Sequence, residues 1–166
     1  MEIKNVRISI SMKKKVFYTL GSIIGIIVLA FAYYAISPFF INIKLDEALP
    51  ETKQMESKAM EKSQVQIVSA PVVGTTGHPA SGTARVIEVD GKSYVRYENF
   101  KTINGPDLYI YLAKDLDAKE YVNLGTLRAT EGNVNYEIPQ SVNPAEYQYV
   151  MVWCKQFGVL FNYAEI

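Results

Sequence analysis

The sequence has 166 residues, with 17 lysine or arginine and 17 aspartate or glutamate residues, so its formal net charge is zero. A neutral chain lacks the basic field that non-specific nucleic-acid binding needs, and we expect no nucleic-acid partner. A single cysteine, Cys154, and a single histidine, His78, exclude an internal disulfide, multi-cysteine zinc sites and copper sites with two imidazoles. We therefore expect no metal site.

Charge is distributed unevenly along the chain. Residues 1–15 contain five basic residues and one acidic residue, a net charge of +4. Residues 65–166 contain eight basic and eleven acidic residues, a net charge of −3. Because basic residues next to a membrane span stay on the inner side, we predict that residues 1–15 form a cytoplasmic tail.

The next segment predicts a membrane helix, because residues 16–43 include no charged side chain. Residues 16–36 would span the roughly 30 Å hydrocarbon layer as a helix, and Pro38 favours an end there. We predict a retained signal-anchor in the cell membrane, with a single span and an extracytoplasmic C-terminal part. A cleaved signal peptide is the alternative, since Ala30-Phe31-Ala32 resembles a cleavage site. The uncharged stretch is, however, longer than the apolar region of a signal peptide, which usually has roughly 7–15 residues.

Residues 37–64 are predicted to be a juxtamembrane linker, because residues 44–64 are charged and lack aromatic side chains. A short stalk helix over residues 51–62 is one interpretation, because good helix formers dominate there. We favour a solvated linker, because the apolar stripe of that helix would be only about one residue wide.

From residue 65 to the end, short β-branched and aromatic runs alternate with turn residues, which predicts an all-β domain over residues 65–166. Asp90-Gly91 between two alternating runs is typical of a tight hairpin turn. Seven or more short strands in about 100 residues indicate a two-sheet β-sandwich or a closed β-barrel. The predicted strands are 83–89, 92–100, 107–113, 121–129, 134–138, 147–155 and 159–165.

The run at residues 149–154 is apolar on both faces, which predicts a central strand. Alternation would place Met151 and Trp153 on one face and Cys154 on the other. Gly105, between Asn104 and a proline, is expected to adopt a turn conformation that other residues avoid.

Five segments of the β region form an ordered set of motifs: GHPASGTA (77–84), NFKTINGPDLYIYL (99–112), LGTL (124–127), GNVNYEIP (132–139) and VWCKQFGVLF (152–161). Together they resemble the electron-transfer DM-thirteen domain, the Skeletor-type module, over residues 73–166. The resemblance implies an extracytoplasmic β domain that takes part in electron transfer, with Cys154 as a free thiol or as a ligand to a prosthetic group such as haem.

The candidate site consists of Cys154 as the reactive residue, with His78 and Trp153 as further cofactor-binding residues. His78 would lower the thiol pKa or supply a second haem ligand if the loop of residues 75–81 folds over Cys154, and a hydrogen-bonded turn residue is the alternative. Trp153 and nearby tyrosines would shield the redox site or relay electrons to it.

The sequence is compatible with two functions. The first is a redox component, rather than a complete enzyme, that works with a redox or cell-surface protein partner. The second is a non-enzymatic cell-surface binding or structural module in which Cys154 is a buried core residue.

Overall fold

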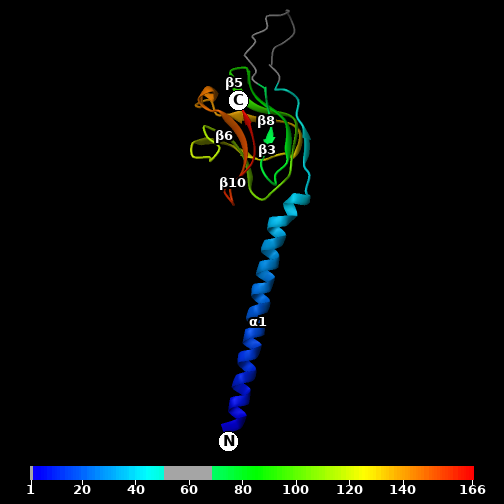
Figure 1. The fold of residues 1–166 in the computed structure, drawn as a ribbon, viewed down its shortest axis with the longest axis vertical. Coiled ribbons are helices and arrows are strands. Elements are labelled where there is room, and N and C mark those ends of the chain that lie inside the picture. The colour runs from blue at the N-terminus through cyan, green and yellow to red at the C-terminus, as the bar shows by residue number, and fades with distance from the viewer. Residues whose placement is uncertain (1, 51–68) are drawn as a thin grey trace, which may run out of the picture. The chain divides into compact units, whose positions relative to one another are not determined.

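The computed structural model describes residues 2–50 and 69–166 (Figure 1). The chain divides into two compact units, Met1–Pro38 and Phe39–Ile166. The second unit contains the β-strands. The predicted stalk helix over residues 51–62 lies outside the described residues.

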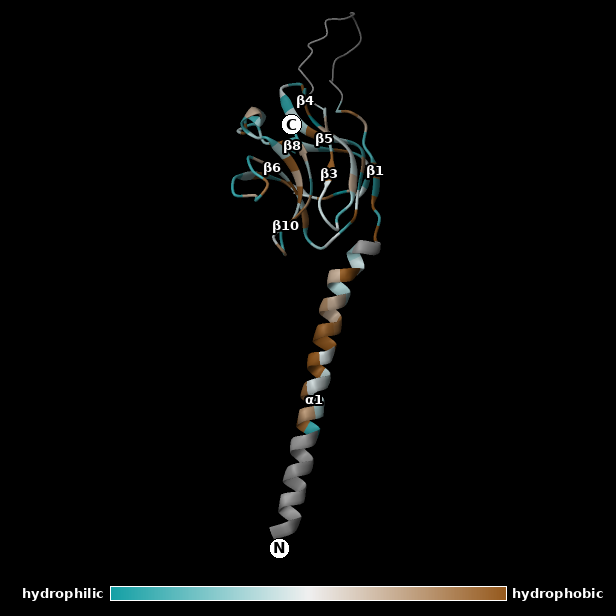
Figure 2. Cartoon of the chain, in the orientation of Figure 1, coloured by the Kyte–Doolittle hydropathy of each residue, from teal (hydrophilic) through white to brown (hydrophobic). Residues whose placement is uncertain are grey.

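The first unit consists of helix α1 (Glu2–Ile36) and the first two residues of the short 3₁₀ helix η1 (Ser37–Phe40). Lys15–Ile36 is long and apolar enough to cross a membrane (Figure 2). The predicted apolar helix is therefore confirmed. A retained anchor and a signal sequence share these features, so the orientation of the chain stays a prediction.

The second unit contains two five-stranded sheets, which confirms the predicted two-sheet sandwich and excludes the closed barrel. Their inner faces enclose a common core that includes Val95, Ile110 and Val152. In spatial order, the first sheet is β1 (Lys44–Asp46), β8 (Glu131–Ile138), β5 (Lys92–Thr102), β4 (Ala80–Val89) and β2 (Ser69–Pro71). The second is β3 (Val73–Gly74), β10 (Val159–Glu165), β9 (Tyr149–Cys154), β6 (Leu108–Ala113) and β7 (Tyr121–Thr126).

The predicted hairpin between β4 and β5 is present. Asp90 and Gly91 both have positive φ, 52° and 70°, and Val89 pairs with Lys92. The turn therefore matches the right-handed twist of its two strands, as an Asp-Gly turn should.

Strand β9 is the middle strand of its sheet, as its two apolar faces predicted. Val152 and Cys154 face the core between the sheets, whereas Met151 and Trp153 belong to a second apolar cluster on the outer face. Two neighbouring residues of β9 therefore lie in different environments.

The first part of the expected linker is a strand instead. Within β1, Lys44 pairs with Glu131 and Asp46 with Asn133 in parallel register along the edge of β8. Beyond the strand, the Glu47 amide donates to Asn133 O at 2.9 Å. A solvated linker was the wrong prediction here, because strand β8 supplies a free edge whose backbone groups pair with this segment.

Candidate functional site

Cys154 is the last residue of β9 and lies at the edge of the core, with only 1% of its surface exposed. Its Sγ–H donates to the carbonyl oxygen of Pro106 at 3.0 Å. Pro106 lies two residues before Leu108, the first residue of β6, and Leu108 pairs with Cys154. The thiol is therefore held between the end of one strand and the turn that leads into the next.

This covering segment, residues 104–107, is called the 104–107 turn below. The Asn104 side chain accepts a hydrogen bond from the Gly105 amide at 2.9 Å, and the Lys155 amide donates to Asp107 O at 3.0 Å. Asp107 has a φ of 57°. The turn is thus fixed at both ends, once by its own asparagine and once by the residue that follows Cys154.

The predicted special backbone conformation of Gly105 is wrong, because the positive φ belongs to Asp107 and not to Gly105. Space explains the glycine instead. A Cβ atom on Gly105 would lie 2.8 Å from Cζ of Phe161, well inside van der Waals contact. The missing side chain lets the buried Phe161 ring pack directly against the turn.

Phe161 reaches the turn because β10 has an irregularity at this point. The register shifts between Leu160 and Asn162, so Phe161 is an extra residue opposite β9. Such a bulge re-aims a side chain. Here the Phe161 ring joins the same core cluster as Cys154.

The His78 ring packs against the ring of Phe161, and the two ring centroids are 3.9 Å apart. Its Nδ1 lies 3.1 Å from the Thr75 hydroxyl oxygen. That hydroxyl donates to Leu160 O at 2.7 Å and Phe161 O at 3.0 Å. Since threonine has one hydroxyl proton, the network assigns the ring proton to Nδ1, where it is donated to Thr75.

Burial lowers the pKa of His78 below its ordinary 6.5, and a backbone hydrogen bond at Thr76 only partly opposes this shift. The ring is therefore neutral at pH 7. Among the described residues no hydrogen bond joins His78 to Cys154, because the first contacts Thr75 and Phe161 while the second bonds to Pro106. His78 is thus a hydrogen-bonded turn residue in this conformation.

Trp153 lies on the opposite face of β9 and is half-buried. Its ring is stacked near Tyr111, with centroids 6.5 Å apart, and Tyr111 stacks on Tyr121 at 4.1 Å. Burial, followed by the hydrogen bond with Tyr121, raises the pKa of Tyr111 to about 12. Lys155 places its Nζ 5.4 Å from the centre of the Tyr109 ring on the same face.

These positions decide what the three candidate residues can do together. Because Cys154 and Trp153 face opposite sides of β9, they cannot line one cofactor pocket. The described conformation does not fit a haem ligated by Cys154, since its sulfur is enclosed and bonded to Pro106. Two described cavities, of about 250 and 410 Å³, are lined by other residues.

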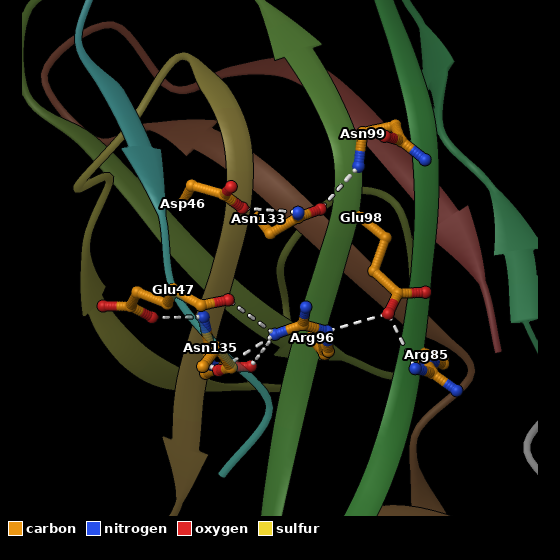
Figure 3. A network of polar contacts seen from close by, with 9 residues as sticks. Asp46, Glu47, Arg85, Arg96, Glu98, Asn99, Asn133 and Asn135 are labelled. Atoms are coloured by element: carbon orange, nitrogen blue, oxygen red, sulfur yellow. Dashed lines mark hydrogen bonds and ion pairs between the residues drawn. The ribbon is translucent and has the colours of Figure 1, made fainter.

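A polar network on the outer face of the first sheet was not predicted (Figure 3). Arg96 is 6% exposed and donates from Nε to Glu98 at 2.8 Å and from Nη1 to Asn135 at 2.9 Å. Arg85 donates to the same Glu98 oxygen at 2.7 Å. Burial would raise the pKa of Glu98, but the hydrogen bonds and charges of both arginines outweigh it and lower that pKa.

The segment after β1 completes this network. Arg96 Nη1 also donates to the carbonyl oxygens of Glu47 and Ala48, at 3.2 and 3.3 Å, and the Asn135 amide donates to the Glu47 carboxylate at 2.7 Å. The alternation of Arg96 with apolar Val95 and Tyr97 places it on the outer face. The burial of Arg96 could not be predicted, because Glu47 and Ala48, which cover it, were predicted to belong to a linker.

Comparison with known proteins adds one finding. Residues 73–166 match the family model described as electron transfer DM13, the family that the sequence resembles. No curated protein and no solved structure matches the chain. The matched region contains the whole 104–107 turn, His78, Trp153 and Cys154.

Proposed function

The chain belongs to the electron transfer DM13 family, and from this membership we propose that it is a membrane-anchored electron-transfer module whose redox-active group is the Cys154 thiol. The observation that carries the proposal is the hydrogen bond from Sγ to Pro106 O in the 104–107 turn. A thiol at the end of a strand can be uncovered by movement of this one turn while the rest of β9 stays paired, because local openings cost less than global unfolding.

In the closed conformation the residues around Cys154 enclose its sulfur, and only 1% of the surface of this residue is exposed. Pro106 O accepts the S–H hydrogen bond, and the Phe161 ring packs against the turn beside it. The thiolate is the reactive form of cysteine, and an enclosed thiol without a base is inert. Opening of the turn is therefore the step that controls reactivity.

Glutathione disulfide tests this proposal on the full chain in detergent. Once uncovered, the Cys154 thiol loses its proton to water and attacks one sulfur of the disulfide, and the other glutathione leaves as a thiolate that takes up a proton. We expect the native protein to gain one glutathione, measured by mass spectrometry, and Cys154→Ser to gain none. Modification that appears only after the chain is unfolded would contradict the proposal.

A second function is favoured by one specific observation, the 1% exposure of Cys154 within the core cluster. If the cysteine only fills the core, the β unit is a binding or structural module without redox chemistry. Cys154→Ala would then lower stability and leave partner binding unchanged. The glutathione experiment separates the two functions, because a core-filling thiol reacts only in the unfolded chain.

The orientation of the chain is part of the same proposal. We propose that residues 1–15 are cytoplasmic, that the helix of residues 16–36 is a retained anchor, and that the β unit faces outward toward a redox or cell-surface protein partner. The +4 charge of residues 1–15 supports this orientation. Protease added to intact cells should digest the β unit, whereas protection until lysis would contradict it, and the mass of the mature protein would reveal cleavage after Ala32.

A further inference from the structure

One end of the β unit presents exposed apolar side chains from two segments that are distant in sequence. Phe157, 48% exposed, and Val159 lie where the chain passes from β9 into β10. Ile41 and Ile43 are exposed just before β1. Exposed apolar residues that gather at one place are typical of protein-binding or membrane-binding surfaces.

The 104–107 turn shows that both segments lie at the same end of the sandwich. On one side the Asn104 side chain donates to Ile41 O at 3.1 Å. On the other side Asp107 O accepts the amide of Lys155, two residues before Phe157. We call Ile41, Ile43, Phe157 and Val159 the apolar end.

The covalent chain brings a lipid surface within reach of this end. Only Ser37–Phe40 separate Ile36, the last residue of the apolar helix, from Ile41. Five residue steps extend at most about 18 Å. Where Lys15–Ile36 is held in a bilayer, that bilayer is available to the apolar end at all times, whereas a soluble protein partner must first be recruited.

We propose that the apolar end docks on the bilayer, with Phe157 and Val159 inserted among the lipid headgroups and acyl-chain ends. Lys155 supports this mode of binding, because it is exposed next to the apolar end and its ammonium, 5.4 Å from the centre of the Tyr109 ring, can stay in the headgroup layer. The inference rests on retention of the helix as an anchor, and it is independent of any chemistry at Cys154.

Tryptophan quenching by lipids brominated on the acyl chains tests the docking. Phe157→Trp places a reporter at the apolar end of the full chain, reconstituted in phosphatidylcholine vesicles that contain brominated lipid. Tyr121→Trp is the matched control, because Tyr121 is 44% exposed and pairs with Ala113 at the opposite end of β6. The parent chain gives the signal of Trp153 alone, which is subtracted.

We expect the reporter at position 157 to lose at least half of its fluorescence and the reporter at position 121 to lose less than about one-tenth. Equal quenching at the two positions, strong or weak, would overturn the docking. Flotation of the chain with the vesicles reports on the anchor separately. A chain that floats without selective quenching contradicts the docking alone, and a chain that does not float contradicts the anchor as well.

Discussion

Strand β1 can pair with β8 only because residue 132 is a glycine. Gly132→Ala therefore tests whether β1, which was expected to be part of a linker, belongs to the folded β unit. A Cβ atom at Gly132 would lie 1.9 Å from the carbonyl oxygen of Leu45, which is backbone and cannot rotate away. Strand β1 must then move off the edge of β8. Gly132 also has a φ of 119°, so alanine adds backbone strain of about 1–3 kcal/mol by itself.

The matched control is Gly125→Ala, because Gly125 has a nearly equal φ of 113° and no atom within 4 Å of the added Cβ. The difference between the two variants isolates the displacement of β1. The displacement would break at least three of the hydrogen bonds of this segment, from Glu47 N to Asn133 O, from Thr130 N to Ile43 O, and from Ile43 N to Thr130 Oγ1. At about 1 kcal/mol each, they contribute about 3 kcal/mol.

Urea unfolding of the full chain in detergent, followed by circular dichroism, measures this difference. We expect Gly132→Ala to lower the free energy of unfolding by about 3 kcal/mol more than Gly125→Ala does. Hydrogen exchange should also quicken at the amides of residues 130 and 131, which donate to Ile43 O. Equal losses in the two variants would refute the assignment of β1 to the β unit.

Three further outcomes follow from the site and the network. Gly105→Ala should lower the free energy of unfolding by about 1–3 kcal/mol through its clash with Phe161, and adding Phe161→Leu should recover part of this loss in the same urea assay. The pKa of His78 is lower in the folded chain than in the unfolded chain, so the unfolded chain is protonated first as the pH falls, and the urea midpoint should decrease at pH values below about 6.5. His78→Gln should remove this part of the pH dependence. An unchanged dependence of the urea midpoint on pH in that variant would contradict the role of His78. Arg96→Met should lower the free energy of unfolding by about 2–3 kcal/mol because it breaks a buried charged network, whereas Lys92→Met, which removes an exposed ion pair, should lower it much less. Similar losses of stability in the two variants would show that the network adds no stability.

Strands β4 to β10 could be predicted from the sequence because their side chains alternate and turn residues separate them, whereas the two very short strands β2 and β3 were not predicted. The two faces of β9 and the Asp90-Gly91 turn were predicted for the same reason, since both depend on local sequence alone. Strand β1 could not be predicted in this way. It has three residues, and its pairing depends on an edge of β8 that lies 87 residues away in the sequence.

The candidate site was predicted less completely than the fold. Alternation places Cys154 on the core face, but its cover depends on the Phe161 bulge and the 104–107 turn, which are products of packing. The role of Gly105 was misassigned for the same reason, because a glycine required by a neighbouring ring looks the same in sequence as one required by its φ. The Arg96 network was missed because its partners come from distant strands and from the segment after β1.

The most direct test of the proposed redox role is the rate at which Cys154 reacts with a bulky maleimide in the native full chain, measured at increasing denaturant below the unfolding transition. If the 104–107 turn controls access, the rate should be independent of denaturant at low concentration. Gly105→Ala should raise this rate about tenfold for each 1.4 kcal/mol by which it destabilises the closed turn. Gly125→Ala, which touches nothing near the turn, should leave the rate unchanged. A rate that follows global unfolding from the lowest denaturant concentration, and that rises equally in both variants, would contradict the proposal and make Cys154 a core residue only.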